Sequence, residues 1–188
     1  MQFKELSIPG VFEIQYDPKI DERGFFMRTY DKELFAAHGL PTEWPQESHA
    51  MTKDKGTIRG IHFLYPPYNE AKFIRMSRGE GFWVFLDLRK GSPTLGKRGT
   101  LVMSAERHHA LFLPKGIANA ICTITDDCEV LYHMDIAYRD EAKSEIRWND
   151  PELAIPWPVE KPTVLSPRDE NAQSFKEFLE KSGGGLIV

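Results

Sequence analysis

The chain has 188 residues, of which 41% are hydrophobic and 28% are charged, a balance typical of globular proteins and unlike that of disordered ones. This length is enough to bury a sizeable core, and we expect one domain over residues 1–188. The formal net charge of -4 lacks the basic excess of general nucleic-acid-binding proteins, so no nucleic-acid partner is expected. An anionic small ligand is compatible with this charge, because a few arginines can form a local basic pocket.

The sequence contains no signal for export or for a membrane. The first five residues do not join a basic start to an apolar run, and no apolar run approaches the ~20 residues of a membrane helix. Cys122 and Cys128 form no CxxC pair and belong to no set with zinc spacing, which indicates two reduced thiols. We therefore expect a cytoplasmic protein.

Short apolar runs between turn residues predict most of the strands. In chain order they cover residues 11–14, 72–76, 82–88, 100–103, 110–113, 120–125 and 129–134. Several are rich in Val, Ile, Phe and Thr and are too short for good helices, so they predict an antiparallel β-sandwich or barrel. The run from Phe82 to Leu86 is apolar at every position, as expected of a strand that is covered on both faces.

Only two segments predict helices. Residues 31–38 begin at Asp31, a favourable N-cap, and end before Gly39. Residues 174–181 place their apolar side chains on one side of a short C-terminal helix. The last residues, 183–188, start with three glycines and predict a loose tail. The sequence thus predicts a mainly β fold with a few short helices.

The spacing of the histidines does not predict a metal site. A catalytic metal in a protein usually has about three protein ligands. The segment around His62 holds a single histidine, and Asn119 stands where a second ligand would be useful. His108 and His109 are adjacent, so on a strand their side chains point to opposite faces. We expect neither a metal nor another cofactor.

His62 lies among basic residues, with Arg59 three positions before it and Lys72 ten positions after it. A base, a guanidinium and an ammonium group in so short a stretch favour a pocket for an acidic or carbonyl-bearing ligand. The alternative is ordinary packing or solvation, since most histidines in strands are structural and most charged loops are solvated. The residues alone leave both readings open.

A series of short motifs adds a family resemblance. They are DERGFF (21–26), IRGIHF (58–63), AKFIR (71–75), LDLRKGSPTLG (86–96), MSAE (103–106), LPKGIAN (113–119), RWNDP (147–151), IPWP (155–158) and LSPRD (165–169). In order and spacing the chain resembles the dTDP-4-dehydrorhamnose 3,5-epimerases over nearly its whole length. The resemblance implies a jelly-roll (cupin-like) antiparallel β-barrel, a homodimer that exchanges N-terminal strands, and a reaction without a metal.

The resemblance also implies roles for individual residues. It places the base at His62, its orienting carboxylate at Asp169, a lysine at Lys72 and a tyrosine acid at Tyr132. Substrate-binding positions fall on Arg23, Phe26, Gln46, Arg59, Asn119 and Tyr138, with the two arginines facing the diphosphate. Taken without the resemblance, Asp169 is better explained as a turn residue, Tyr132 as a packing residue and Arg23 as a solvated turn residue.

These residue types suit the implied chemistry on a nucleotide-linked 4-keto-6-deoxyhexose. Protons beside the ketone are weakly acidic, and an imidazole with an ordinary pKa of ~6.5 can accept one at pH 7. A buried aspartate would fix its tautomer and stabilise the imidazolium. Lys72 would offset the charge that develops on the C4 oxygen, and Tyr132 would donate a proton from the opposite face.

Three departures from the family pattern limit what the resemblance implies. Asn119 replaces the usual histidine, Trp83 replaces a common aspartate, and residues 46–48 read QES instead of QDN. The first two changes together remove an interacting pair without leaving a lone buried charge. With His62 and Lys72 retained, we expect epimerisation at C3 and C5. The alternatives are a single-centre epimerase or ketoisomerase acting on a variant dTDP- or CDP-linked sugar, and a non-catalytic cupin that binds a sugar nucleotide.

Overall fold

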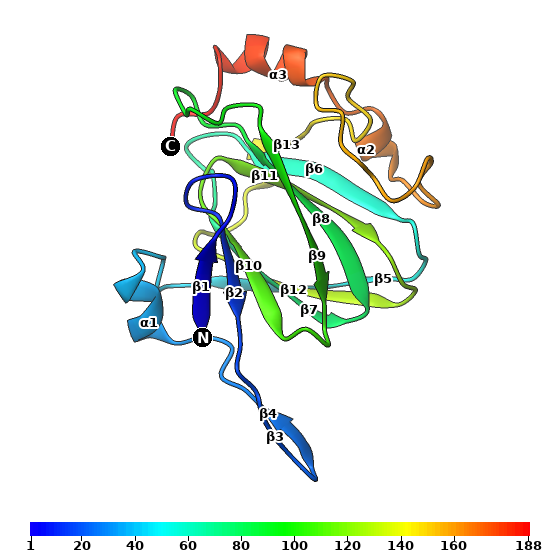
Figure 1. Ribbon diagram of the computed structural model, residues 1–188. Coiled ribbons are helices and arrows are strands. Elements are labelled where there is room, and N and C mark those ends of the chain that lie inside the picture. The colour runs from blue at the N-terminus through cyan, green and yellow to red at the C-terminus, as the bar shows by residue number, and fades with distance from the viewer.

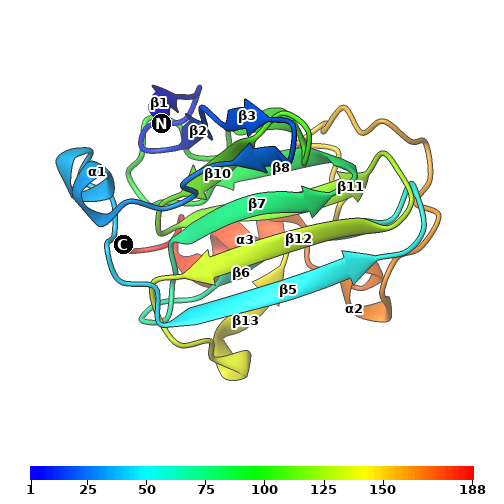
Figure 2. The same cartoon turned by 90° about the horizontal axis from the view of Figure 1, so that it is seen from below.

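Two antiparallel sheets that face each other dominate the computed structural model, which describes all residues from 1 to 188 (Figures 1 and 2). One sheet has the order β1 (Gln2–Glu5), β2 (Phe12–Gln15), β10 (His109–Leu113), β7 (Lys72–Arg78), β12 (Cys128–Met134) and β5 (Gln46–Thr52). The other has the order β13 (Lys143–Glu145), β6 (Ile58–Leu64), β11 (Ile117–Thr123), β8 (Glu80–Asp87) and β9 (Arg98–Ser104). The prediction of a mainly β, antiparallel fold is confirmed.

The remaining elements lie around these sheets. They are the hairpin of β3 (Lys19–Asp21) and β4 (Gly24–Phe26), the helices α1 (Lys32–Ala37), α2 (Pro167–Glu170) and α3 (Phe175–Ser182), and the short 3-10 helix η1 (Asp140–Ala142). The hairpin projects away from the sheets, whereas α3 lies against the five-stranded sheet (Figure 1). None of the helices is long and apolar enough to cross a membrane.

Strand β8 shows why this sheet is apolar on both faces. Trp83 and Phe85 point between the two sheets, where they join the main core cluster. Val84 and Leu86 point the other way and pack in the cluster that α3 covers with Phe178. The prediction that this run is covered on two sides is confirmed, because alternate residues of a strand serve opposite faces.

Both predicted helices are present, and the predicted N-cap at Asp31 is confirmed. The Asp31 carboxylate accepts hydrogen bonds from the backbone N–H groups of Glu33 and Leu34, both at 3.2 Å. At α3, the Ser174 hydroxyl and the Glu177 side chain form a reciprocal capping box. Such caps satisfy backbone donors that a short helix otherwise leaves without partners.

The C-terminal segment is ordered against the body of the protein, so the prediction of a loose tail was wrong. Leu186 is 2% exposed, its N–H donates to the Leu88 carbonyl at 2.7 Å, and its carbonyl accepts from the Lys90 N–H at 2.8 Å. A Cβ at Gly185 would lie 2.9 Å from the backbone of Leu88 and Lys90. Gly185 therefore permits a close approach of two backbones next to the buried leucine.

A polar cluster holds the end of β8. The fully buried Asp87 carboxylate accepts hydrogen bonds from Arg89 Nη2 at 2.7 Å and from the hydroxyls of Ser92 and Thr94, both at 2.6 Å. Burial alone would raise the pKa of Asp87, but these hydrogen bonds outweigh it and lower that pKa from 3.8 to about 2. Charged Asp87 therefore stabilises the fold.

We predict that Asp87→Asn lowers the free energy of unfolding at pH 7 by about 2 kcal/mol, the value that corresponds to a pKa shift of this size. Because the pKa is lowered in the folded state, the contribution is fully present above about pH 4 and is lost as the pH falls through about 2. Urea unfolding at several pH values measures it, with the exposed Asp17→Asn as control. Equal acid sensitivity of the wild type and Asp87→Asn would contradict this account.

We also predict that Leu186→Ala destabilises the protein by about 2–5 kcal/mol, the usual effect of truncating a buried leucine. Ile187→Ala is the matched control, since this neighbouring side chain is 72% exposed and its loss leaves no cavity. Denaturant unfolding of the two variants decides the question. Indistinguishable midpoints would show that the segment is not docked in solution.

Candidate active site

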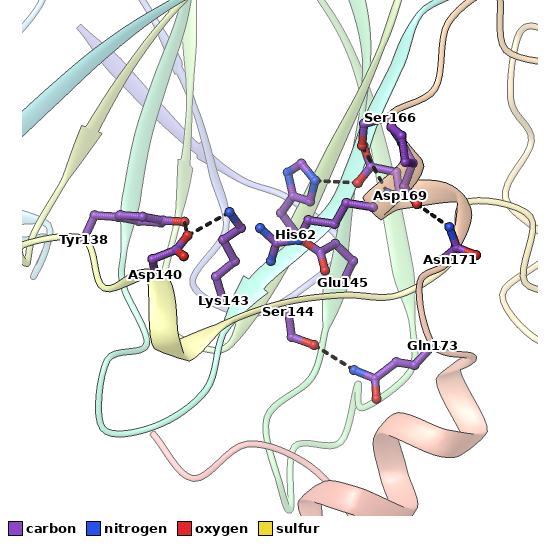
Figure 3. A network of polar contacts seen from close by, with 12 residues as sticks. His62, Tyr138, Asp140, Lys143, Ser144, Glu145, Ser166, Asp169, Asn171 and Gln173 are labelled. Atoms are coloured by element: carbon purple, nitrogen blue, oxygen red, sulfur yellow. Dashed lines mark hydrogen bonds and ion pairs between the residues drawn. The ribbon is translucent and has the colours of Figure 1, made fainter.

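A hydrogen bond between His62 and Asp169 joins two segments that lie 107 residues apart in the sequence. His62 lies on β6 and is 41% exposed in its side chain, whereas the Asp169 side chain on α2 is only 5% exposed. The His62 Nε2 atom lies 2.7 Å from Asp169 Oδ1 (Figure 3). When the ionised carboxylate accepts from Nε2–H, the other ring nitrogen keeps its lone pair and can accept a proton.

The start of helix α2 holds the Asp169 carboxylate in place. Ser166 is the N-cap of this helix; its hydroxyl donates to Asp169 Oδ2 at 2.8 Å, and the Asp169 N–H donates back to Ser166 Oγ at 3.1 Å. Burial opposes ionisation, but the hydrogen bonds from His62 and Ser166 prevail and lower the pKa of Asp169 below its usual range. The carboxylate is therefore charged at neutral pH.

Close packing of β6 against β11 positions His62 opposite Asn119. These two residues are paired across the strands, and the register shifts just after them. At Gly60, where φ is +116°, a Cβ would lie 2.7 Å from the Asn119 carbonyl and 2.8 Å from Ala120 Cβ. Glycine at this position therefore allows the two strands to approach beside the histidine.

Lys72 enters the same region from the opposing sheet, on β7. Its Nζ donates to Asn119 Oδ1 at 3.0 Å and lies 3.1 Å from Glu70 Oε1. The side chains of Lys72 and Glu70 are only 16% and 7% exposed. The ammonium group is thus held by two oxygens at a defined point, where it can stabilise negative charge on a bound ligand.

Tyr132 on β12 lies deeper between the sheets. Its ring centroid is 6.0 Å from that of Trp83. Burial raises the pKa of Tyr132 to about 12, although the nearby positive charge of Arg59 acts in the opposite direction. The phenol therefore stays protonated at neutral pH and is available only as a proton donor.

A cavity of about 440 Å³ opens beside these groups. His62, Asp169, Lys72, Arg59 and Tyr138 line it, whereas Tyr132 and Asn119 do not. A base, a fixed ammonium and a guanidinium therefore face one volume that suits a small anionic or carbonyl-bearing ligand.

A family model described as dTDP-4-dehydrorhamnose 3,5-epimerase matches residues 5–177 of the chain. The chain belongs to this family. It is 37% identical to the dTDP-4-dehydrorhamnose 3,5-epimerase of Shigella flexneri over 178 residues, which cover 93% of this chain and 96% of that protein. It is also 38% identical to a dTDP-4-dehydrorhamnose 3-epimerase of Streptomyces niveus, with coverage of 94% and 85%.

Solved structures of the epimerase family share the fold. The dTDP-4-dehydrorhamnose 3,5-epimerase of Bacillus anthracis, solved with TDP and PPi bound, has a TM-score of 0.89 to this chain at 34% identity, covering 93% of this chain and 99% of that one. This likeness confirms the predicted cupin-like jelly roll and the recognition of the family from short motifs.

Two of the predicted binding residues lie far from the cavity of this epimerase chain. Arg23 and Phe26 belong to the projecting β3–β4 hairpin, and neither lines the cavity. Arg23 forms an ion pair with Asp21 in the same hairpin, and Phe26 is 72% exposed. Within one chain, the structure does not bring them to His62.

The other predicted binding residues lie closer to the site. Arg59 is held by Thr52 Oγ1 and the Met51 carbonyl, at 2.8 and 3.3 Å. The Gln46 side chain contacts the backbone of Tyr138, since its Oε1 accepts a hydrogen bond from the Tyr138 N–H at 2.6 Å. The Tyr138 hydroxyl donates to Asp140 at the cavity edge (Figure 3).

The residues that depart from the family pattern have clear environments. Asn119 provides the amide oxygen that binds Lys72, so the position keeps a polar contact without a titratable group. Trp83 is fully buried in the core, and its indole N–H has no hydrogen-bond partner. An unpaired buried donor costs about 1–3 kcal/mol, which the apolar contacts of the large ring offset.

The sequence analysis missed several polar residues of the cavity wall. Glu145, Arg168, Lys143 and Ser166 all line it. Glu145 is the direct cross-strand partner of His62, and Arg168 contacts it from α2. The pairing of β13 with β6 places Lys143 and Glu145, and no local sequence pattern predicts that pairing. Ser166 and Arg168 lie in the LSPRD motif at α2, but only the fold brings them to the cavity.

Three possible metal-ligating groups lie together, although the sequence suggested no such set. One ligand atom each from His62, Glu145 and Asp169 can be chosen so that all lie within 4.8 Å of one another. His62 and Asp169 already bind each other, and Glu145 binds Arg168. A cation would have to displace these contacts and lie near a guanidinium, so the arrangement favours proton transfer over metal binding. The absence of a metal stays a prediction.

Proposed function

We propose that this chain inverts C3 and C5 of a nucleotide-linked 4-keto-6-deoxyhexose, as a member of the dTDP-4-dehydrorhamnose 3,5-epimerases. The observation that carries the proposal is the His62–Asp169 hydrogen bond on the wall of the same cavity as Lys72. This arrangement provides a base, its orienting carboxylate and a fixed cation for an enolate oxygen. A protein that only binds a nucleotide sugar has no need of a histidine oriented by a buried carboxylate.

In the proposed reaction, His62 removes a proton from the carbon next to the ketone. The electron pair moves to the C4 oxygen, where Lys72 stabilises the enolate. Reprotonation from the opposite face inverts the centre, and Tyr132 is the proposed donor because its phenol stays protonated. Since Tyr132 does not line the cavity, its use requires the sugar to enter as far as the Trp83 side of the site.

The nucleotide part is proposed to be dTDP, which is supported by the TDP bound to the relative from Bacillus anthracis. Arg59, Tyr138, Gln46 and Asn119 are the proposed substrate-binding residues of one chain. We further propose a cytoplasmic homodimer in which the β3–β4 hairpin carries Arg23 and Phe26 to the site of a second copy. The projecting hairpin and the 72% exposure of Phe26 support this arrangement.

We predict that the protein introduces deuterium at both C3 and C5 of dTDP-4-keto-6-deoxyglucose in deuterated water, as followed by proton NMR. His62→Ala is expected to slow exchange by about 10²–10⁴-fold, the usual contribution of a general base. His38→Ala, at an exposed position after α1, is the matched control. Exchange at one carbon alone would identify a single-centre epimerase, and undiminished exchange in His62→Ala would exclude the proposed base.

Asp169→Asn is expected to reduce kcat by about 10²–10⁴-fold with a smaller change in KM, because the amide neither fixes the tautomer nor stabilises the imidazolium. Glu170→Gln, the exposed neighbour on the same helix, is the control for lost charge. Steady-state kinetics with the same sugar nucleotide compare the two. Similar kcat values in both variants would show that Asp169 is not part of the machinery.

A further inference from the structure

A second carboxylate lies beside the His62–Asp169 pair and has no role in the reaction described so far. Glu145 on β13 is the cross-strand partner of His62 on β6, and its side chain is 11% exposed on the cavity wall. One oxygen of Glu145 belongs to the group of atoms that lie within 4.8 Å of one another with those of His62 and Asp169. Figure 3 shows these three side chains together at the end of α2.

Arg168 completes this cluster. It precedes Asp169 on α2, its side chain is 35% exposed, and its Nε contacts Glu145 Oε1. The other charged groups on this wall are engaged elsewhere: Lys143 pairs with Asp140 at 2.8 Å. Across the cavity, Lys72 is held by Glu70 and Asn119. Arg59, three residues before His62, also lines the cavity and is held by Thr52 Oγ1 and the Met51 carbonyl. The charges in direct contact with His62 or Glu145 are therefore two carboxylates and one guanidinium.

We propose that Glu145 is a positioning residue that increases the basicity of His62 and that Arg168 is its charge partner. The inference rests on the proposed function, since it assigns Glu145 to the same proton transfer. Two carboxylates and one guanidinium give one net negative charge beside a neutral imidazole. When His62 accepts a proton, the cluster becomes neutral as a whole, so the imidazolium form is stabilised.

A merely structural role explains this arrangement less well. Placing a second carboxylate beside Asp169 brings like charges together in a partly desolvated site, which is unfavourable without compensation. Burial and the Asp169 charge raise the pKa of Glu145 to about 7, while contact with Arg168 acts in the opposite direction by stabilising the charged form. The Arg168 contact therefore favours the ionised form of Glu145 against burial and the Asp169 charge.

The test compares how the reaction and the His62 ring depend on pH in matched variants. Glu145→Gln keeps the shape of the side chain and removes its charge, so the acidic limb of the kcat/KM profile is expected to move to lower pH by roughly one unit. The double variant Glu145→Gln/Arg168→Gln leaves Asp169 alone and restores one net negative charge. The acidic limb of its kcat/KM profile is expected to return toward the wild-type pH. A loss of packing around residue 145 would not be reversed by a second substitution.

Two further variants separate charge from folding. Glu145→Asp keeps the negative charge, so the acidic limb of its kcat/KM profile should stay at the wild-type pH even if kcat falls. Glu33→Gln, at an exposed position on α1, controls for the general loss of one negative charge. The proposal would be overturned if the acidic limb of Glu145→Gln stayed at the wild-type pH. It would also be overturned if the limb of the double variant stayed at the pH of Glu145→Gln.

Titration of the His62 ring by NMR in the free protein makes the test independent of the substrate. The midpoint of the His62 titration is expected to move to lower pH in Glu145→Gln and to return toward the wild-type value in the double variant. If the wild type shows no deuterium exchange, the proposed epimerase function fails, while the ring titration still decides whether Glu145 and Arg168 control the charge at His62.

Discussion

The hydrogen bond between His62 and Asp169 is the contact on which the organisation of the site depends. It forms only when a strand of the jelly roll and a short helix 107 residues later in the chain lie side by side. His62 Nε2 and Asp169 Oδ1 are then 2.7 Å apart. Ser166 begins that helix and donates to the same carboxylate, so the cap that starts α2 also orients the proposed partner of the base. A buried, ionised aspartate next to an imidazole is stable only when such donors replace lost hydration. The Ser166 hydroxyl therefore both caps the helix and holds the carboxylate that takes part in the proposed reaction.

The space between the two sheets is divided along the strands into an apolar and a polar region. On β7, Lys72 faces the cavity, while Ile74 and Met76 further along the strand belong to the core. Trp83 fills the inner part and lies against Tyr132, so the phenol marks the boundary between the two regions. Large apolar side chains exclude water there, which strengthens the electrostatic effect of the few polar groups that remain. Asn119 fits this pattern, since it binds the Lys72 ammonium without adding a charge.

Local patterns predicted those elements whose signals are local. The strands with alternating or continuous apolar residues, the helix that begins at the Asp31 cap and the amphipathic helix near the C-terminus were found from sequence. Strand β5 was missed because it is an edge strand with mostly exposed polar residues, QESHAMT, and has no apolar face to detect. The C-terminal glycines were misread as flexible, because a close backbone approach and a loose linker have the same local sequence.

For the candidate site, the motifs identified His62, Lys72 and Asp169, and the structure places all three on one cavity. Glu145 was not predicted because its importance depends on the register between β13 and β6, which brings it opposite the histidine. Only that pairing turns an ordinary surface sequence, AKSEI, into a wall of the site. No single motif contains the proposed charge balance, in which Asp169 would orient the base, Glu145 would add negative potential, and Arg168 would offset the repulsion between the two carboxylates. Position 119 lies on β11, on one side of His62, whereas Glu145 lies on β13, on the other side, and Arg168 lies on α2. The proposed charge cluster therefore does not involve the position at which asparagine replaces the family's usual histidine.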